Sequence, residues 1–259
     1  MASIKRNING WIINKSQGAE MITKHNSLIE SSYKLTLNEQ RLLLIGISKL
    51  DSRKPLSENK LVEITAKEFS EIYKINIKKA YKELEKSSKD LYERDIKTFD
   101  GKYRERLRWV YQVKYYHGEG KVKLGFSPCL ISYLSMLHKR FTSYPIKQIS
   151  QLKSIYSIRI FEFLMQFKNT GVFFIELNKF KERLGIKNEY KRFFDFKKIV
   201  INRAVKELNE KTNLFIEWKA IKNKSGKSIS QIEFSFTEKK IIEISPNIET
   251  DLGKEEVIY

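Results

Sequence analysis

Cysteine and histidine are scarce in this 259-residue chain, which has one cysteine, Cys129, and three histidines. A single cysteine excludes a disulfide within the chain and a zinc site built from several thiolates, and it fits a reducing cytosol. His25, His117 and His138 form no His-x-His pair and no i, i+4 pair. A metal-dependent nicking site with a tyrosine nucleophile would need clustered histidines. No nucleophile-elbow motif is present either, so we expect no metal, no cofactor and no enzymatic activity.

Long apolar runs are also missing. The longest, residues 42–47, is far shorter than the ~20 residues that cross a bilayer. The apolar residues Trp11–Ile13 are too few for the core of a signal peptide. We therefore expect a soluble, cytoplasmic protein with no membrane partner.

Positive charge is abundant: the formal net charge is +19. Such an excess attracts polyanions, of which nucleic acid is the first candidate and an anionic membrane surface the second. A lysine-rich composition imposed by an AT-rich genome is the alternative explanation. The 41% of apolar residues, with 16 Phe and 13 Tyr, can fill the cores of two domains of about 100–130 residues each.

Local patterns predict an α+β fold with two domains. Thr36 and Glu39 have the spacing of a helix-capping box, and Thr65 and Asn178 are further candidate N-caps. Gly185 is placed as a helix C-cap. We predict a basic tail (1–22), a first domain (23–140), a linker (141–149), a second domain (150–240) and an acidic tail (241–259). The expected helices are 37–50, 66–73, 77–92, 128–139, 150–167, 178–184 and 190–213, and the expected strands are 61–64, 96–99, 107–116, 122–126, 172–177 and a hairpin over 214–236.

The two halves resemble each other. Residues 64–69 match residues 175–180 at an offset of 111, and residues 80–84 match residues 204–208 at an offset of 124. The second half therefore has 13 extra residues ahead of the shared helix, near 188–200. Each half reads helix, strand, helix, helix, hairpin, which is the order of a winged helix. The sequence thus predicts two tandem winged-helix domains that arose by internal duplication.

The long helix of the second half has a basic face. On a helical wheel centred on Val200, the apolar residues gather on one side and polar residues on the other. Residues 191–227 contain eleven Lys or Arg and only four Asp or Glu, so the face suits DNA, although a charged helix face is often merely solvated. Arginine suits guanine edges, asparagine suits adenine, and aspartate suits cytosine or orients a neighbouring arginine. The far side carries Lys191, Asp195, Lys198, Asn202, Lys206 and Asn209, with Arg192 at its edge.

Three further groups of residues are candidates for contacts with DNA or with another subunit. The hairpin tip places Lys222, Lys224 and Lys227 on a tight turn that suits phosphate contacts, and it lacks the first glycine of a phosphate-binding loop. In the first domain, Lys78, Lys79 and Lys82 lie on the equivalent helix and are candidates for backbone contacts. Glu83 and Glu85 interrupt the positive charge there, which favours a structural, dimerisation or partner-binding role for this domain and leaves the second domain as the main DNA reader. The aromatic residues Trp109, Tyr111, Tyr115 and Tyr116 belong either to the core and sheet face or to a subunit interface.

Several motifs together resemble the iteron-binding plasmid replication initiators. They are Tyr190-x2-Phe-x-Asp-Phe-Lys-Lys-x-Val, Ala204-Val-Lys-Glu-Leu-Asn209, Leu28-Ile-Glu-Ser-Ser-Tyr33, Leu37-x-Glu-Gln-Arg-Leu42 and Ser157-x-Arg-x-Phe-Glu-Phe-Leu164. The resemblance covers residues 23–237. It implies a bacterial protein that acts on plasmid DNA, binding the direct repeats of an origin as a monomer and recruiting a host replication initiator and helicase. It also implies a dimer, joined through the first domain, that binds an inverted repeat and represses its own gene.

The resemblance also assigns roles to residues. It points to Arg192, Asp195 and Lys198 as base-reading residues and to Lys197 and Arg203 as phosphate contacts. The family often has Arg where this chain has Lys197 and Lys198, and lysine lacks the bidentate fork of arginine. A winged-helix repressor without a replication role is the alternative function, and a nicking enzyme is the third.

Overall fold

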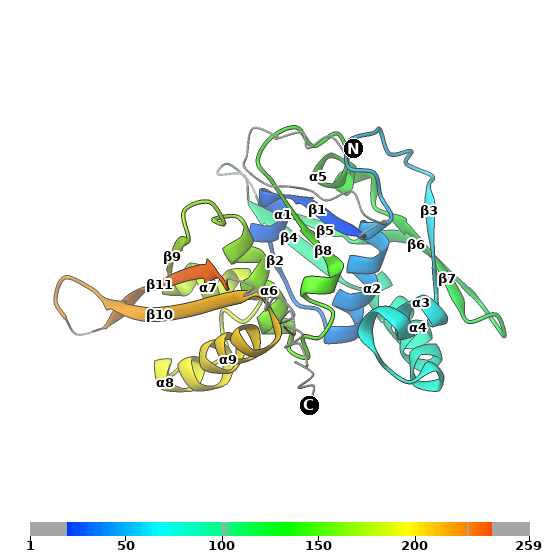
Figure 1. The fold of residues 1–259 in the computed structure, drawn as a ribbon. Coiled ribbons are helices and arrows are strands. Elements are labelled where there is room, and N and C mark those ends of the chain that lie inside the picture. Colours follow the sequence, from blue (N-terminus) through cyan, green and yellow to red (C-terminus); the bar gives the residue numbers. More distant parts are fainter. Residues whose placement is uncertain (1–19, 100–101, 103, 227, 240–259) are drawn as a thin grey trace, which may run out of the picture.

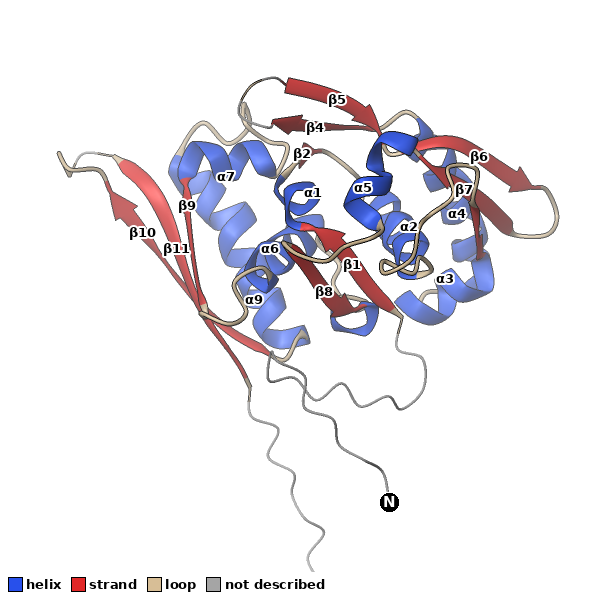
Figure 2. Ribbon diagram, turned by 90° about the horizontal axis from the view of Figure 1, so that it is seen from above, coloured by secondary structure: helices blue, strands red, loops and turns tan. Residues whose placement is uncertain are grey.

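The computed structural model describes residues 20–99, 102, 104–226 and 228–239. The acidic tail, almost all of the basic tail, Asp100, Gly101, Tyr103 and Lys227 lie outside these residues. The chain folds into two units side by side, with helices in the middle and a small sheet at each end (Figures 1 and 2).

The first unit has the strand and helix order of a winged helix. Its sheet runs in the order β3-β7-β6, so the first strand pairs with the last strand of the hairpin. The helices cover one face of this sheet. The elements are α2 (Leu37–Ser48), β3 (Leu61–Thr65), α3 (Ala66–Tyr73), α4 (Ile77–Tyr92), β6 (Val110–Tyr116) and β7 (Lys121–Phe126).

The second unit repeats this topology, with its sheet in the order β10-β11-β9. Ile64 pairs with Val122 in the first sheet, and Ile175, which is 111 residues after Ile64, pairs with Ile232 in the second. The α+β fold with two winged-helix units is thereby confirmed. The elements are α6 (Ile155–Met165), β9 (Val172–Glu176), α7 (Leu177–Arg183), α8 (Phe193–Phe196), the π-helical turn η3 (Lys197–Ile201), α9 (Asn202–Lys211), β10 (Leu214–Lys222) and β11 (Ile229–Glu238).

The single strand predicted over residues 107–116 is wrong. The chain changes sheets at Trp109, whose fully buried indole packs edge-on against Tyr33. Before Trp109, β5 (Arg104–Arg108) pairs with β4 (Asp95–Phe99), which pairs in turn with β2 (Ser32–Tyr33); after it, β6 pairs with β7. The hairpin β4–β5 is therefore an addition to the first unit, placed between α4 and the wing.

Helix boundaries follow their capping residues. Thr36 forms the predicted capping box with Glu39, and Gly185 ends α7 with a φ of +72°. Thr65 is the N-cap of α3, as predicted, and in addition completes a capping box with Glu68. Asn178 is not a cap: α7 begins at Leu177 and has no side-chain cap. The helix predicted from residue 150 begins instead at Ile155, because the chain bends at 149–154 before the Ser154 hydroxyl accepts the first capping hydrogen bond.

The helix predicted over 128–139 is also shorter. It consists of a 3-10 turn, η1 (Pro128–Leu130), and a single α turn, α5 (Ile131–Leu134). It ends there because Ser135 is extended and Met136 has a φ of +53°.

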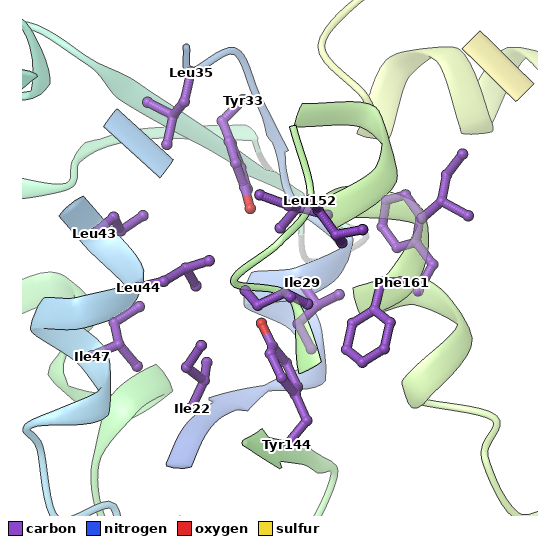
Figure 3. Packing of buried hydrophobic residues seen from close by; sticks show 14 of the residues in the cluster. Ile22, Ile29, Tyr33, Leu35, Leu43, Leu44, Ile47, Tyr144, Leu152 and Phe161 are labelled. Atoms are coloured by element: carbon purple, nitrogen blue, oxygen red, sulfur yellow. The ribbon is translucent and has the colours of Figure 1, made fainter. Parts of the chain in front are cut away.

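The segment between the two units is structured. Residues of the predicted linker form β8 (Phe141–Pro145) and the 3-10 turn η2 (Ile146–Gln148). β8 pairs along its whole length with β1 (Met21–His25), which leads into α1 (Asn26–Glu30). Apolar side chains from both units pack around this pair, as Figure 3 shows for Ile22, Tyr144 and Phe161. One continuous core therefore holds the two units together.

A buried ionic cluster lies in that core. Lys24, Arg159 and Glu162 are each at most 2% exposed, and Glu162 accepts bonds from Lys24 and from the Tyr144 hydroxyl. Arg159, in α6, donates to the Glu162 carboxylate, to the Tyr33 hydroxyl and to three backbone carbonyls, of which two belong to the first unit. Because a buried charge is costly unless its partners stay in place, this cluster fixes how the two units are oriented.

Candidate nucleic-acid interface

The reading helix (residues 193–211) is made of α8, η3 and α9 in continuous succession. At the offset of 124, Ile201 corresponds to Ile77, the first residue of α4. Residues 193–200 are therefore a helical extension that the first unit lacks, and they fall in the predicted insertion. The rest of the insertion lengthens the loop before the helix.

The π turn η3 changes the direction of the buried stripe. The buried residues form two groups: Phe196 and Val200 in the first half of the helix, and Ile201, Ala204, Val205 and Leu208 in the second half. The boundary between the groups lies within η3, between Val200 and Ile201. On a regular wheel of about 100° per residue, the centres of the two groups differ by about 100°. This is the rotation of one residue, as expected where an i→i+5 turn interrupts an α-helix. One wheel drawn over the whole helix is therefore wrong by one residue across this turn.

The outward face differs accordingly in the two halves. In the first half it carries exposed Phe194 and Lys198 and the half-buried Asp195, and Lys191 is exposed in the loop before the helix. In the second half exposed Arg203 and Lys206 point away from the core. Asn202 is exposed as well. Within the residues that the structure describes, no ion pair or side-chain hydrogen bond involves Lys198, Asn202 or Arg203, so all three are available to a ligand.

Asp195 holds the side chain of Arg192. The Arg192 Nε and Nη2 atoms donate to its two carboxylate oxygens at 2.7 and 3.1 Å. These hydrogen bonds raise the pKa of Arg192. Of the two roles predicted for Asp195, the structure shows the orienting one: the planar fork of Arg192 is prearranged at the start of the helix.

The loop before the helix is fixed from the core side. Lys181, in α7, donates to the carbonyls of Glu189 and Tyr190 at 3.1 and 2.7 Å. Its ammonium group also lies 5.4 Å from the ring centre of Phe196. The backbone of Tyr190 is left-handed, with a φ of +51°, so this turn sets the direction in which the helix begins.

The wing contributes two described lysines. Lys222 and Lys224 are exposed beside the turn, which closes at Gly226 with a φ of +70°. The Asn223 amide braces the turn by donating to the Ser228 hydroxyl at 2.9 Å. Lys197, at the other end of the interface, lies over the ring of Trp218 on β10 at 5.7 Å, which joins the reading helix to its wing.

Asn209 does not belong to the interface, although the wheel placed it on the polar side. Its amide donates to the Ile216 carbonyl at 2.9 Å, and its oxygen accepts from the Ile216 amide at 2.7 Å. The side chain thus fastens the end of the helix to β10. Lys206 makes only a long ion pair with Glu210, at 3.9 Å, and stays exposed.

The first unit carries exposed lysines on α4. Lys78, Lys79 and Lys82 are all exposed on α4, and Figure 1 shows α4 and the reading helix along one side. Because the buried cluster fixes the two units, the two helices keep this placement, in which a single duplex can contact both. The aromatic residues of the first unit divide: Trp109 lies in the core, whereas Tyr111 is 37% exposed on β6.

Two features of the interface escaped sequence reasoning. Phe194 is 65% exposed on the outward face, and apolar side chains can contact the thymine methyl group. The contact of Lys197 with Trp218 depends on the packing of the wing. The doublet Phe193-Phe194 was a signal, because two adjacent residues of a helix cannot both face the core of a narrow stripe.

The described residues contain no cluster of three or more His, Cys, Asp or Glu that could hold a metal ion. In the same part of the chain, every helix is too short or too polar to cross a membrane.

Comparisons with known proteins match both units. A family model described as "Initiator Replication protein, WH1" matches residues 21–165, and one described as "Initiator Rep protein, WH2" matches residues 176–236. The PI protein of Escherichia coli is 24% identical over 249 residues, covering 83% of this chain and 82% of that protein. A replication initiation protein of Escherichia coli is 27% identical over 223 residues, covering 83% and 68%. The crystal structure of Pi initiator protein in complex with iteron DNA matches with a TM-score of 0.74 and 22% identity, over 87% of this chain and 100% of that one.

Proposed function

This chain belongs to the initiator replication (Rep) protein family with two winged-helix domains, and from that premise we propose that it initiates plasmid replication by binding repeated double-stranded DNA at an origin. The observation that carries the proposal is that α4 and the reading helix, both with exposed basic residues, lie along one side of two units that share one core. The similar Pi initiator was solved with iteron DNA, which supports the same class of ligand here.

The residues divide into two roles. Arg192, oriented by Asp195, and Lys198 on the outward face of the reading helix read bases in the major groove. Contacts to phosphates add affinity and salt dependence without sequence information. They come from Lys191, Lys197, Arg203 and Lys206, from Lys222, Lys224 and Lys227 at the wing, and from Lys78, Lys79 and Lys82 on α4.

The assembly and partners extend this proposal. A monomer binds the direct repeats and brings a host replication initiator and helicase to them. A dimer joined through the first unit binds an inverted repeat and represses the initiator gene in the bacterial cytoplasm. The protein carries no catalytic activity of its own. Incubation with single-stranded origin DNA and divalent metal ions tests this: we expect no cleavage, and cleavage would contradict it.

The binding experiment uses Arg192→Ala with Lys198→Ala. Fluorescence anisotropy measures affinity for the repeats beside the gene and for a scrambled duplex of equal length. A lost base contact costs about 1–3 kcal/mol, so we expect the double variant to lose its preference for the repeats. Arg53→Ala with Lys54→Ala is the matched control, because it removes the same two charges from the exposed loop before β3.

If the double variant still prefers the repeats over the scrambled duplex, Arg192 and Lys198 are not the base-reading residues. The repressor alternative is separated by transformation: a minimal plasmid that carries the gene and its upstream repeats replicates if the protein is an initiator and fails to replicate if it is only a repressor.

A further inference from the structure

The outer face of the second sheet is acidic and aromatic. Along β9 and β10, Phe174 and Phe215 are 57% and 51% exposed, and Glu176 and Glu217 are exposed beside them. Glu233 of β11 lies between them and pairs with Lys219 at 2.9 Å. The five residues Phe174, Glu176, Phe215, Glu217 and Glu233 are called the acidic face. An acidic surface is unexpected in a chain with a net charge of +19, and its charge would repel DNA.

The outer face of the first sheet has the opposite charge. On β6 and β7, Lys114, Lys121 and Lys123 face outward together with Tyr111 and Tyr116, and these five residues are called the lysine face. The ammonium groups of Lys121 and Lys123 lie 4.6 and 5.5 Å from the ring centre of Tyr116.

Ion pairs neutralise part of this charge. Lys121 pairs with Glu119 at 2.6 Å and Lys123 with Glu63 at 3.5 Å. Lys114 is exposed and makes no ion pair within the described residues. The lysine face therefore keeps a positive excess.

The two faces occupy corresponding positions in the repeated fold. Each is the side of a three-stranded winged-helix sheet that its own helices leave uncovered. Figure 2 shows the two sheets at opposite ends of the molecule, with the helices between them. The faces therefore cannot meet within one chain, but the acidic face of one copy can meet the lysine face of the next.

We propose that these two faces form a head-to-tail contact between copies of this chain bound to neighbouring direct repeats, with aromatic rings contributed by both faces and opposite charges facing each other across the contact. A contact between two different surfaces repeats in one direction and does not close on itself. Tandem repeats in one orientation place the copies in that arrangement. The inference rests on the proposed binding of direct repeats.

The test compares one repeat with two. Affinity is measured for duplexes with a single repeat and with two tandem repeats at their natural spacing. Coupling between sites is commonly about 5- to 150-fold, and we expect a value in this range for the unsubstituted chain. Glu176→Lys with Glu217→Lys reverses the acidic face, and Lys114→Glu with Lys123→Glu reverses the lysine face.

Each reversal alone should reduce the coupling to about onefold while the single repeat is still bound, because like charges then face each other. The chain that carries all four substitutions presents opposite charges again and should regain the coupling. Regained coupling cannot come from damaged folding, and any general change in attraction to DNA is measured on the single repeat.

Coupling that survives either reversal, or that the fourfold variant does not regain, overturns the inference. An unsubstituted chain that binds one repeat normally but shows no coupling on two also overturns it and leaves the proposed function intact. Failure to bind even one repeat overturns the proposed function itself.

Discussion

Replacing Glu162 with glutamine removes the only negative charge from the buried ionic cluster and keeps the shape of the side chain. Lys24 and Arg159, at 1% and 2% exposure, are then left without their carboxylate. Removing one partner of a buried ion pair costs about 3–5 kcal/mol. Because two cations lose the same partner here, we expect a loss near the upper end of that range.

Equilibrium unfolding in urea measures the loss. The slope is about 1–3 kcal/mol per molar urea and rises with chain size, so a value near 3 applies to a chain of this length. A loss of about 5 kcal/mol then lowers the midpoint by about 1.7 M. Glu182→Gln is the control, because its carboxylate makes an exposed ion pair with Lys187 at 3.3 Å and such pairs contribute about 0–1 kcal/mol. A loss below about 1 kcal/mol in Glu162→Gln would refute the idea that the cluster fixes the two units.

The same variant predicts a pH dependence. Burial raises the pKa of the Glu162 carboxyl, but Lys24 and Arg159 outweigh burial, so the pKa lies below the ordinary value of 4.5. A carboxyl with a lowered folded-state pKa contributes stability above its unfolded pKa and loses it as the pH falls. The difference in unfolding free energy between the unsubstituted chain and Glu162→Gln should therefore be constant above about pH 5 and shrink below pH 4.5.

Three further predictions concern other parts of the structure. Asn209→Ala removes the two hydrogen bonds to β10 and should lower the unfolding free energy by about 1–3 kcal/mol. Gly185→Ala should be more destabilising than Gly226→Ala in thermal unfolding: both glycines have a positive φ, but only at Gly185 would a Cβ atom lie 2.4 Å from a backbone oxygen of the other unit. Lys222→Ala with Lys224→Ala should reduce the salt dependence of log K by about 2 without changing the preference among DNA sequences; an unchanged slope would exclude phosphate contacts at the wing.

The sequence predicted features that depend on neighbouring residues. The capping box at Thr36, the N-cap at Thr65 and the glycine C-cap at Gly185 could be predicted because each depends on only about four neighbouring residues. The order of elements and the repeat were visible because the two copies preserve the same spacing. These local rules were sufficient to predict two winged-helix units and a basic reading helix.

Features that depend on packing between distant segments could not be predicted. Trp109 lies within a run that alternates like one strand, but its indole fits a core site beside Tyr33, and the chain turns there into a second sheet. Lys24 and Glu162 are 138 residues apart, and a lysine near the start of a basic chain gives no sign of a buried partner. Asn209 falls on the polar side of the helical wheel, and its hydrogen-bond partners, the carbonyl and amide of Ile216, belong to a different element, β10.

The π turn η3 has a consequence for how the specificity of this surface can change. A substitution on the outward face alters one contact, whereas removal of one residue from η3 would restore a regular helix. It would turn residues 193–196 by about 100° and draw them along the axis by about 1.5 Å relative to α9, which stays fastened to β10. Every side chain of the first half would be redirected at once. Insertions and deletions of single residues in this turn are thus a route by which related initiators could acquire different target repeats without altering the rest of the fold.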